Sequence, residues 1–101
     1  MYQGETITTT VTGFPVPLTS AQNVHVIFRD RNGVCLEIDS SDGKILDDNT
    51  FEFKLTQEDS LQLTAGRLSR SVIVIMKDGS RMESNPSDFI VSTTAKEEVL
   101  T

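Results

Sequence analysis

The chain has 101 residues and a net charge of −6, and these totals limit its size and its partners. The length suits one domain with a single modest core, and 37% hydrophobic with 24% charged residues is typical of an ordered protein. The acidic balance argues against nucleic acid and anionic lipid as partners, because both recruit lysine and arginine.

Cysteine content and the first residues bear on the compartment. Cys35 is the only cysteine, so an internal disulfide cannot form, and this count favours a reducing compartment. Residues 1–20 contain neither the basic start nor the apolar stretch of a signal peptide. The longest apolar run, Val72–Met76, is too short to span a bilayer. We expect a soluble protein made in the cytoplasm, with no membrane partner.

The first strand is predicted around Ile7 and Val11, which share one face and are separated by threonines. The two prolines of Gly13–Pro17 then interrupt a regular ladder and predict a bend or a connection between sheets. Leu18 is expected to fill the core beneath this bend.

A hairpin is predicted next. Val24–Arg29 forms the second strand and returns through an Asn32-Gly33 turn into a third strand at Val34–Ile38. Asp39–Asn49 is the most loop-like stretch of the chain, with a turn expected at Asp42-Gly43.

A fourth strand is predicted at Phe51–Leu55, where apolar and charged residues alternate. Thr56 then begins a capping box, because its hydroxyl can accept a hydrogen bond from the amide of Asp59. One helical turn is expected to run from here to Leu61 or Leu63.

The last hairpin is the strongest local signal in the sequence. Val72–Met76 is apolar on both faces, which predicts a central strand covered on two sides. Asp78-Gly79 follows at once and predicts a two-residue primed turn, because glycine supplies the positive φ that such a turn needs. The return strand is Arg81–Ser84, and Asn85-Pro86 separates it from a last strand at Asp88–Thr93.

Together these elements are about seven short strands with one helical turn, the pattern of an all-β antiparallel β-sandwich. The chain is expected to cross between sheets at Gly13–Asn23, at Asp39–Asn49 and at the helical turn. Residues 1–93 are predicted to form this single domain. Residues 94–101 lose the alternation and are expected to be a flexible tail or the start of a linker.

No residue pattern predicts catalysis. His25 is the only histidine, and no Gly-x-Ser-x-Gly elbow frames a nucleophile for it, so a hydrolase would need the fold to place it beside a serine and an aspartate. Cys35 has no neighbouring cation or helix N-terminus to activate its thiol. We interpret His25 as a partly exposed strand residue and Cys35 as a structural one, and we expect a protein that is not an enzyme.

An acidic loop is the one candidate metal site. Calcium binds six to eight oxygens, often from carboxylates in a loop. The candidate ligands are Asp39, Asp42, Asp47 and Asp48. The EF-hand order fails, because Ser41 and Thr50 stand where acidic ligands belong, and the alternative is a solvated loop with Asx-type turns. One cysteine and one histidine cannot form a zinc cluster, and the glycines are scattered singly, so no cofactor is expected.

Phe14 is the candidate interaction residue. It lies in the Gly13–Pro17 bend, from which an exposed aromatic ring could anchor a partner. The alternative is that its ring caps one end of the hydrophobic core.

Several short motifs follow one another in a distinctive order. They are Gly4-Glu5-Thr6, Gly13-Phe14-Pro15-Val16-Pro17-Leu18-Thr19, Phe51-Glu52-Phe53-Lys54-Leu55-Thr56, Glu58-Asp59, Ala65-Gly66, Lys77-Asp78-Gly79, and Pro86 ahead of Phe89-Ile90-Val91. This order, from Gly4 to Ser92, resembles the N-terminal β-sandwich module of the baseplate upper protein family, tail and baseplate proteins of phages that infect Gram-positive bacteria. Arg67-Leu68 departs from the family pattern, which places an aromatic residue after Ala-Gly.

The resemblance implies an immunoglobulin-like sandwich with a structural role. In that family the module docks onto other virion proteins, commonly as a trimer, and a C-terminal extension binds the receptor. We therefore expect a non-catalytic virion protein, assembled in the host cytoplasm, whose partners are other virion proteins and further copies of itself. The alternative is a bacterial cell-surface or carbohydrate-binding sandwich, although the chain has no tryptophan and Tyr2 is its single tyrosine.

Overall fold

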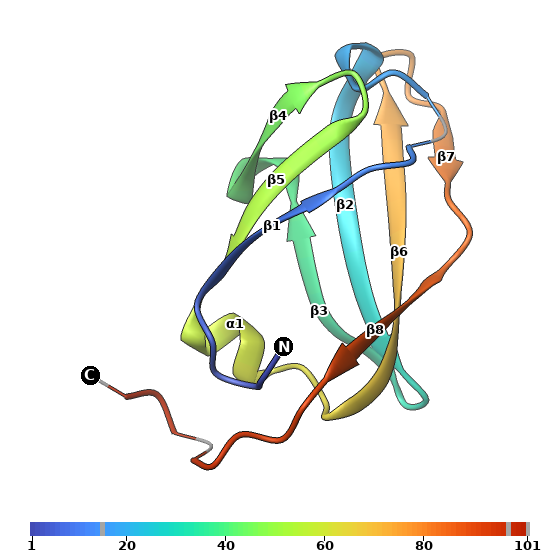
Figure 1. Ribbon diagram of the computed structural model, residues 1–101. Helices are drawn as coiled ribbons and strands as arrows, with labels where there is room; N and C mark the ends of the chain where they lie inside the picture. The colour runs from blue at the N-terminus through green and yellow to red at the C-terminus, as the bar shows by residue number, and fades with distance from the viewer. Residues whose placement is uncertain (15, 97, 101) are drawn as a thin grey trace.

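The computed structural model describes residues 1–14, 16–96 and 98–100, which form two antiparallel β-sheets stacked face to face (Figure 1). The first sheet contains β1 (Ile7–Val11), β4 (Gly43–Asp47) and β5 (Thr50–Leu55), in the order β1-β5-β4. The second contains β2 (Ala21–Asp30), β3 (Gly33–Asp39), β6 (Gly66–Met76), β7 (Arg81–Glu83) and β8 (Ser87–Val91). Short helices lie in the connections: η1 (Leu18–Ser20), η2 (Ser40–Asp42) and α1 (Gln57–Leu61).

The second sheet has the order β3-β2-β6, and both β7 and β8 pair with the edge of β6 away from β2. The chain crosses between sheets from β1 to β2, from β3 to β4 and from β5 to β6, in the three regions that the sequence predicts. These neighbours are those of immunoglobulin strands: β1, β5 and β4 take the places of B, E and D, and β3, β2, β6 and β7–β8 take those of C′, C, F and G. The predicted all-β, immunoglobulin-like sandwich is confirmed.

The hydrophobic core lies between the sheets. The Phe28 ring packs in a T-shaped arrangement with the rings of Phe53 and Phe89, with centroid separations of 6.5 and 5.1 Å. Leu18 is 1% exposed, which confirms that it fills the core beneath the predicted bend. Arg70 takes the inner-face position opposite Phe28, where partial burial lowers the pKa of its guanidinium. The buried apolar residues are Val11, Leu18, Val24, Val26, Phe28, Leu36, Ile38, Phe51, Phe53, Leu55, Leu63, Leu68, Val72, Val74 and Val91.

Both predicted hairpins form, but the turn between β6 and β7 is not the predicted two-residue primed turn. The amide of Gly79 donates to the carbonyl of Met76 at 2.9 Å, and the amide of Met76 donates to the carbonyl of Ser80 at 2.8 Å. Gly79 has a φ of +88°, whereas no described residue other than glycine has a positive φ. Asp78 therefore cannot take a primed-turn position, and the loop is a type I turn closed by a left-handed glycine. Gly33, with a φ of +131°, closes the β2–β3 turn.

The stretch predicted as a loop between Asp39 and Asn49 contains an edge strand, β4, which pairs with β5. Gly43, predicted as a turn residue, is instead extended within this strand. A Cβ at Gly43 would lie 2.6 Å from the ring of Phe51 and would also collide with the carbonyl oxygen of Glu52. The missing side chain therefore lets β4 approach β5 beneath the phenylalanine ring.

Helix α1 begins at the predicted capping box and ends at Leu61, as predicted. The hydroxyl of Thr56 accepts from the amide of Asp59, and a carboxylate oxygen of Asp59 accepts from the amide of Thr56, both at 3.2 Å. The buried Ser60 hydroxyl donates to the carbonyl of Glu5 at 2.8 Å, which ties the helix to the segment before β1. None of the described helices has the length and apolar character needed to cross a membrane.

The N-terminus joins the five-stranded sheet through a parallel bridge between Tyr2 and Ser92. Ser92 is the last described residue with a β-type contact, one residue before the predicted domain boundary. Further along, the carboxamide of Gln57 exchanges hydrogen bonds of 2.8 and 2.9 Å with the backbone of Leu100. The flexibility of residues 94–101 stays a prediction.

Strand β6 is paired on both edges, as predicted, but the opposing sheet covers one of its faces. Val72 and Val74 point into the core and are 5% and 0% exposed. Ile73 and Ile75 point away from it and are half-buried. The prediction of a strand covered on two sides is therefore wrong for the outer face, because apolar alternation identifies the residues that share a face and not what lies over it.

Candidate functional site

The outer face of the five-stranded sheet carries apolar residues that the core does not use. Ile73 lies beside His25, and Ile27 lies beside Ser71, in the register of β2 and β6; Ile75 follows on the same face. The three isoleucines are half-buried by their neighbours, and none of them belongs to the core or packs against it. We call Ile27, Ile73 and Ile75 the isoleucine patch. One face of an antiparallel sheet is commonly polar and solvated, so a patch of this kind is a departure that calls for an explanation.

Polar and charged side chains flank the isoleucine patch on two sides. The Nδ1 atom of His25 lies 3.0 Å from a carboxylate oxygen of Glu37 on β3. On the other side of the patch, the exposed side chains of Arg81 and Glu83 form an ion pair at 3.5 Å. Exposed pairs of this kind contribute little to stability. An apolar centre inside a mixed, charged rim is the usual anatomy of a protein–protein interface.

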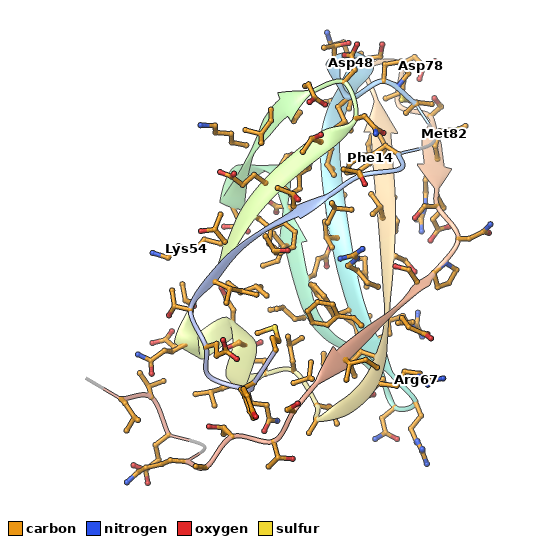
Figure 2. All side chains as sticks on the ribbon, in the orientation of Figure 1. Phe14, Asp48, Lys54, Arg67, Asp78 and Met82 are labelled. Atoms are coloured by element: carbon orange, nitrogen blue, oxygen red, sulfur yellow. The ribbon has the colours of Figure 1, made fainter. Side chains whose placement is uncertain are left out.

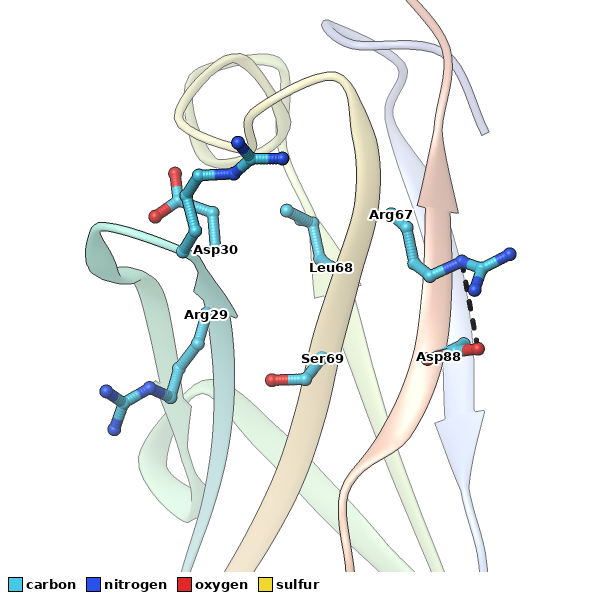
Figure 3. A pocket seen from close by; sticks show the side chains of 7 residues that line it. Arg29, Asp30, Arg67, Leu68, Ser69 and Asp88 are labelled. Carbon is cyan, nitrogen blue, oxygen red and sulfur yellow. Dashed lines mark ion pairs between the residues drawn. The ribbon is translucent and has the colours of Figure 1, made fainter.

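A shallow hollow of about 250 Å³ lies farther along the sheet, between the end of β2 and the start of β6 (Figure 3). It is lined by Arg29, Asp30, Arg31, Arg67, Leu68, Ser69 and Asp88. The Asp30 carboxylate accepts from the Thr64 hydroxyl and from the Asn32 amide, both at 2.7 Å, and these hydrogen bonds lower its pKa. Arg29 and Arg67 point away from each other in Figure 3, so their guanidinium groups do not converge on one anion.

His25 and Cys35 lie on neighbouring strands but take part in separate contacts. His25 is hydrogen-bonded to Glu37, and in the described part of the chain no serine or cysteine side chain bonds to its ring. The Cys35 thiol donates to the carbonyl of Phe28 at 3.4 Å and is half-buried against the core. These contacts agree with the interpretation of both as strand residues.

The candidate calcium ligands Asp39, Asp42, Asp47 and Asp48 do not form one cluster. Asp39 precedes η2 and Asp42 ends it, whereas Asp47 ends β4 and Asp48 follows it, so this strand separates the pairs by about 15 Å. The Asp39 carboxylate accepts from the amide of Ser41 at 2.9 Å, and the Asp47 carboxylate accepts from the amide of Asn49 at 2.8 Å. Among the described residues no group of three or more histidine, cysteine or acidic side chains is placed to hold a metal ion. The structure therefore does not support the candidate calcium site, and Asx-type turns account for two of the four residues.

Phe14 is half-buried and packs against the edge of the core. Phe14 is labelled in Figure 2, and its amide donates to the Asn49 side-chain oxygen at 3.3 Å, which ties the segment after β1 to the residue that precedes β5. This packing agrees with the alternative that Phe14 caps the core. Pro15, in the middle of the predicted bend, lies outside the described residues.

From the sequence, the apolar residues on both faces of Val72–Met76 indicate that both faces are buried. The isoleucine patch is therefore not predicted as a possible interaction surface. Its signal was Ile27, an apolar residue on the face of β2 opposite to Val24, Val26 and Phe28. Pairing of β2 with β6 places this residue near Ile73, and this pairing joins segments more than forty residues apart.

No family model matches the chain, and no curated protein matches it. Among solved structures, it is similar to the V domain of amphioxus IgVJ-C2. The two share 15% sequence identity with a TM-score of 0.38, over 91% of this chain and 95% of that one.

Proposed function

We propose that the chain is a non-catalytic structural protein of a phage virion, a tail or baseplate module that docks onto other virion proteins through the isoleucine patch. One observation carries the docking surface: Ile27, Ile73 and Ile75 lie together on a sheet face that the opposing sheet leaves open. Burial of apolar side chains is the main favourable term in protein association. The order of motifs along the chain, which resembles the baseplate upper protein family, supports the class of partner.

The chemistry of this face favours a protein partner over a sugar. Carbohydrate sites commonly stack exposed aromatic rings on the sugar, whereas the centre of this face is aliphatic. Tyr2, which is 60% exposed, lies at the N-terminus and pairs with Ser92 at the edge of the sheet. The polar rim of His25–Glu37 and Arg81–Glu83 would set the orientation of a protein partner.

The test uses a phage that encodes the chain. We expect mass spectrometry to find the protein in particles purified on a density gradient. Combined Ile27→Thr, Ile73→Thr and Ile75→Thr substitutions keep β-branched side chains but remove apolar surface. Incorporation of this variant should fall by about tenfold or more, which corresponds to the loss of about 1.4 kcal/mol of binding free energy.

The control replaces two exposed apolar residues of the other sheet. Ile45 and Leu46 on β4 are 41% and 45% exposed, and Ile45→Thr with Leu46→Thr should leave incorporation unchanged. Thermal melting of both purified variants checks that they fold. Particles that lack the chain, or equal incorporation of the patch variant and the parent, would contradict the proposal. Absence from particles together with binding of the purified chain to a glycan array would favour the carbohydrate-binding alternative.

A further inference from the structure

The two sheets have four edges in the described structure, and three of them carry features that oppose pairing with another strand. Strand β3 has a register shift against β2 and carries Glu37. Strand β4 has a register shift against β5 and carries Lys44 and Asp47. The β7–β8 edge is interrupted at Pro86 and carries Arg81 among other charged residues. Bulges, charges and proline all discourage the approach of a foreign strand.

Strand β1 is the exception. Its residues, Ile7-Thr8-Thr9-Thr10-Val11, include no charge, proline or glycine, and its register with β5 is regular throughout. Figure 1 shows β1 at the outside of the three-stranded sheet, with β5 on one side. Within the described residues, no backbone hydrogen bond beyond the β5 pairing reaches it. The alternate N–H and C=O groups along its outer edge therefore have no backbone partner in the part of the chain that the structure describes.

The segment before β1 leaves this edge open because it joins the opposite sheet. The amide of Gln3 donates to the carbonyl of Ser92 at 2.9 Å, and the amide of Ser92 donates to the carbonyl of Met1 at 2.7 Å. Residues 1–3 are thus held at the end of β8 and do not lie beside β1. The edge of β1 is therefore open because the N-terminal segment pairs with the other sheet, while β1 itself is a regular strand.

We infer that β1 pairs antiparallel with β1 of a second copy of this chain, about a two-fold axis at Thr9. The two three-stranded sheets then become one continuous sheet. A two-fold interface uses the same surface of both copies, so the strand must be complementary to itself. Strand addition of this kind draws its affinity from main-chain hydrogen bonds and its specificity from alternate side chains.

The sequence of β1 meets this requirement. Antiparallel pairing centred on Thr9 places Ile7 opposite Val11 of the second copy, and Thr8 opposite Thr10. The apolar pair faces the core side, where Val11 is 2% exposed, and the threonine pair faces water. Threonine pairs and β-branched pairs are favourable cross-strand neighbours. Because β1 has no charged residue, the pairing brings no charged side chains of the two β1 strands into contact.

The neighbouring strand favours the antiparallel orientation of the two copies. On β5, Lys54 lies beside Thr8 and Glu52 lies beside Thr10, and Figure 2 shows Lys54 projecting away from the sheet. In the antiparallel pair, Lys54 and Thr8 of one copy lie in line, across the four strands, with Thr10 and Glu52 of the other copy. A parallel pair would align lysine with lysine and glutamate with glutamate. The favourable term is small, because about three strand spacings separate the charges.

The test is the mass of the purified chain in solution. Sedimentation velocity from micromolar to millimolar concentration should show a mass that rises from 11.2 kDa toward twice that value. Combined Thr8→Lys and Thr10→Lys places lysine opposite lysine across the axis, and this variant should remain monomeric at every concentration. Combined Thr8→Glu and Thr10→Lys places glutamate opposite lysine in the antiparallel register and sets each new charge beside an opposite charge on β5, so this variant should dimerise again.

A matched control carries the same charge change away from β1. Thr19 and Thr93 are exposed residues outside the strands, and Thr19→Lys with Thr93→Lys should dimerise as the parent does. Thermal melting of every variant checks the fold. A parent that stays monomeric at millimolar concentration would overturn the inference, and so would a dimer that survives Thr8→Lys with Thr10→Lys.

The inference and the proposed function can fail separately. The Ile27→Thr, Ile73→Thr, Ile75→Thr variant keeps β1 intact and should still dimerise. If this variant is monomeric while the Thr8→Lys, Thr10→Lys variant dimerises, two copies meet through the isoleucine patch, and the β1 inference is wrong. Incorporation into virions plays no part in this measurement.

Discussion

Val74 and Ile75 are neighbours in β6 and are both apolar, yet they lie in opposite environments. Val74 is 0% exposed between the sheets and lies opposite Val24 on β2. Ile75 is half-buried on the outer face, where Arg81 of β7 is its partner in the register. A carboxylate at Val74 would have no partner to offset its desolvation, whereas one at Ile75 would reach both water and a guanidinium.

We expect Val74→Asp to unfold the domain or to lower the free energy of unfolding by about 4 kcal/mol or more. Ile75→Asp should lower it by about 1 kcal/mol or less, because the outer face stays solvated. Urea titration followed by circular dichroism measures both values. Equal losses for the two variants would show that the outer face is as buried as the inner one, and would remove the basis of the isoleucine patch.

Four of the turns contain the same side-chain to backbone hydrogen bond. An aspartate side chain accepts a hydrogen bond from the amide two residues later, at distances between 2.7 and 2.9 Å. The aspartates are Asp30, Asp39, Asp47 and Asp78. The pKa of each is lowered, for Asp30 mainly by the Thr64 hydroxyl, for Asp39 and Asp78 by the serine hydroxyl two residues later, and for Asp47 by an amide. These hydrogen bonds favour the ionised carboxylate in the folded state.

The direction of these shifts predicts acid sensitivity. A pKa that is lower in the folded chain than its ordinary value of 3.8 contributes stability above that value and loses it as the pH falls below. The melting temperature should therefore decline steadily from about pH 5 downward. Combined Asp39→Asn and Asp78→Asn keeps a side-chain acceptor but removes the charge, and should flatten this decline. A parent whose melting temperature is constant between about pH 5 and pH 2 would contradict the prediction.

At the scale of the whole molecule, the first and last segments of the sandwich hold each other in place. Backbone hydrogen bonds join Gln3 to Ser92 and Ser92 to Met1, and the Gln3 carboxamide donates to the carbonyl of Leu63 at 2.9 Å. The amide of Thr94 donates to the Gln3 side chain at 3.3 Å. Residues more than eighty positions apart thus close the end of the molecule where the N-terminus lies (Figure 1).

Removal of residues 1–3 should therefore lower the free energy of unfolding by about 2–4 kcal/mol, since each lost hydrogen bond contributes about 1 kcal/mol. Differential scanning calorimetry measures the loss. A Gly-Ser extension before Met1 leaves these contacts in place apart from that of the terminal amine, and should change the melting temperature little. If the truncated chain melts with the parent, the contacts between the two segments do not contribute to stability.

The sequence by itself determined the features that depend on neighbouring residues. Alternation identified β1, β2, β3, β5 and β6, and the Thr56 capping box located α1, because both signals act within a few residues. Glycines at positions 33 and 79 correctly marked the hairpins, since each supplies a positive φ. The turn type was wrong, because the choice between a primed turn and a type I turn depends on the fit to the two strands.

The tertiary structure alone decided which surfaces are covered. From the sequence, Gly43 is predicted to be a turn residue. In the structure it lies in β4, and the ring of Phe51 on β5 occupies the space that a side chain would need. The four aspartates of the acidic loop lie close together in the sequence, but β4 separates them into two pairs in the structure. The outer face that holds Ile73 and the open edge of β1 depend on where a second sheet and the N-terminal segment come to lie. Local sequence determines the conformation of a strand, whereas its environment is set by residues that are distant in the chain and become neighbours only when the two sheets pack.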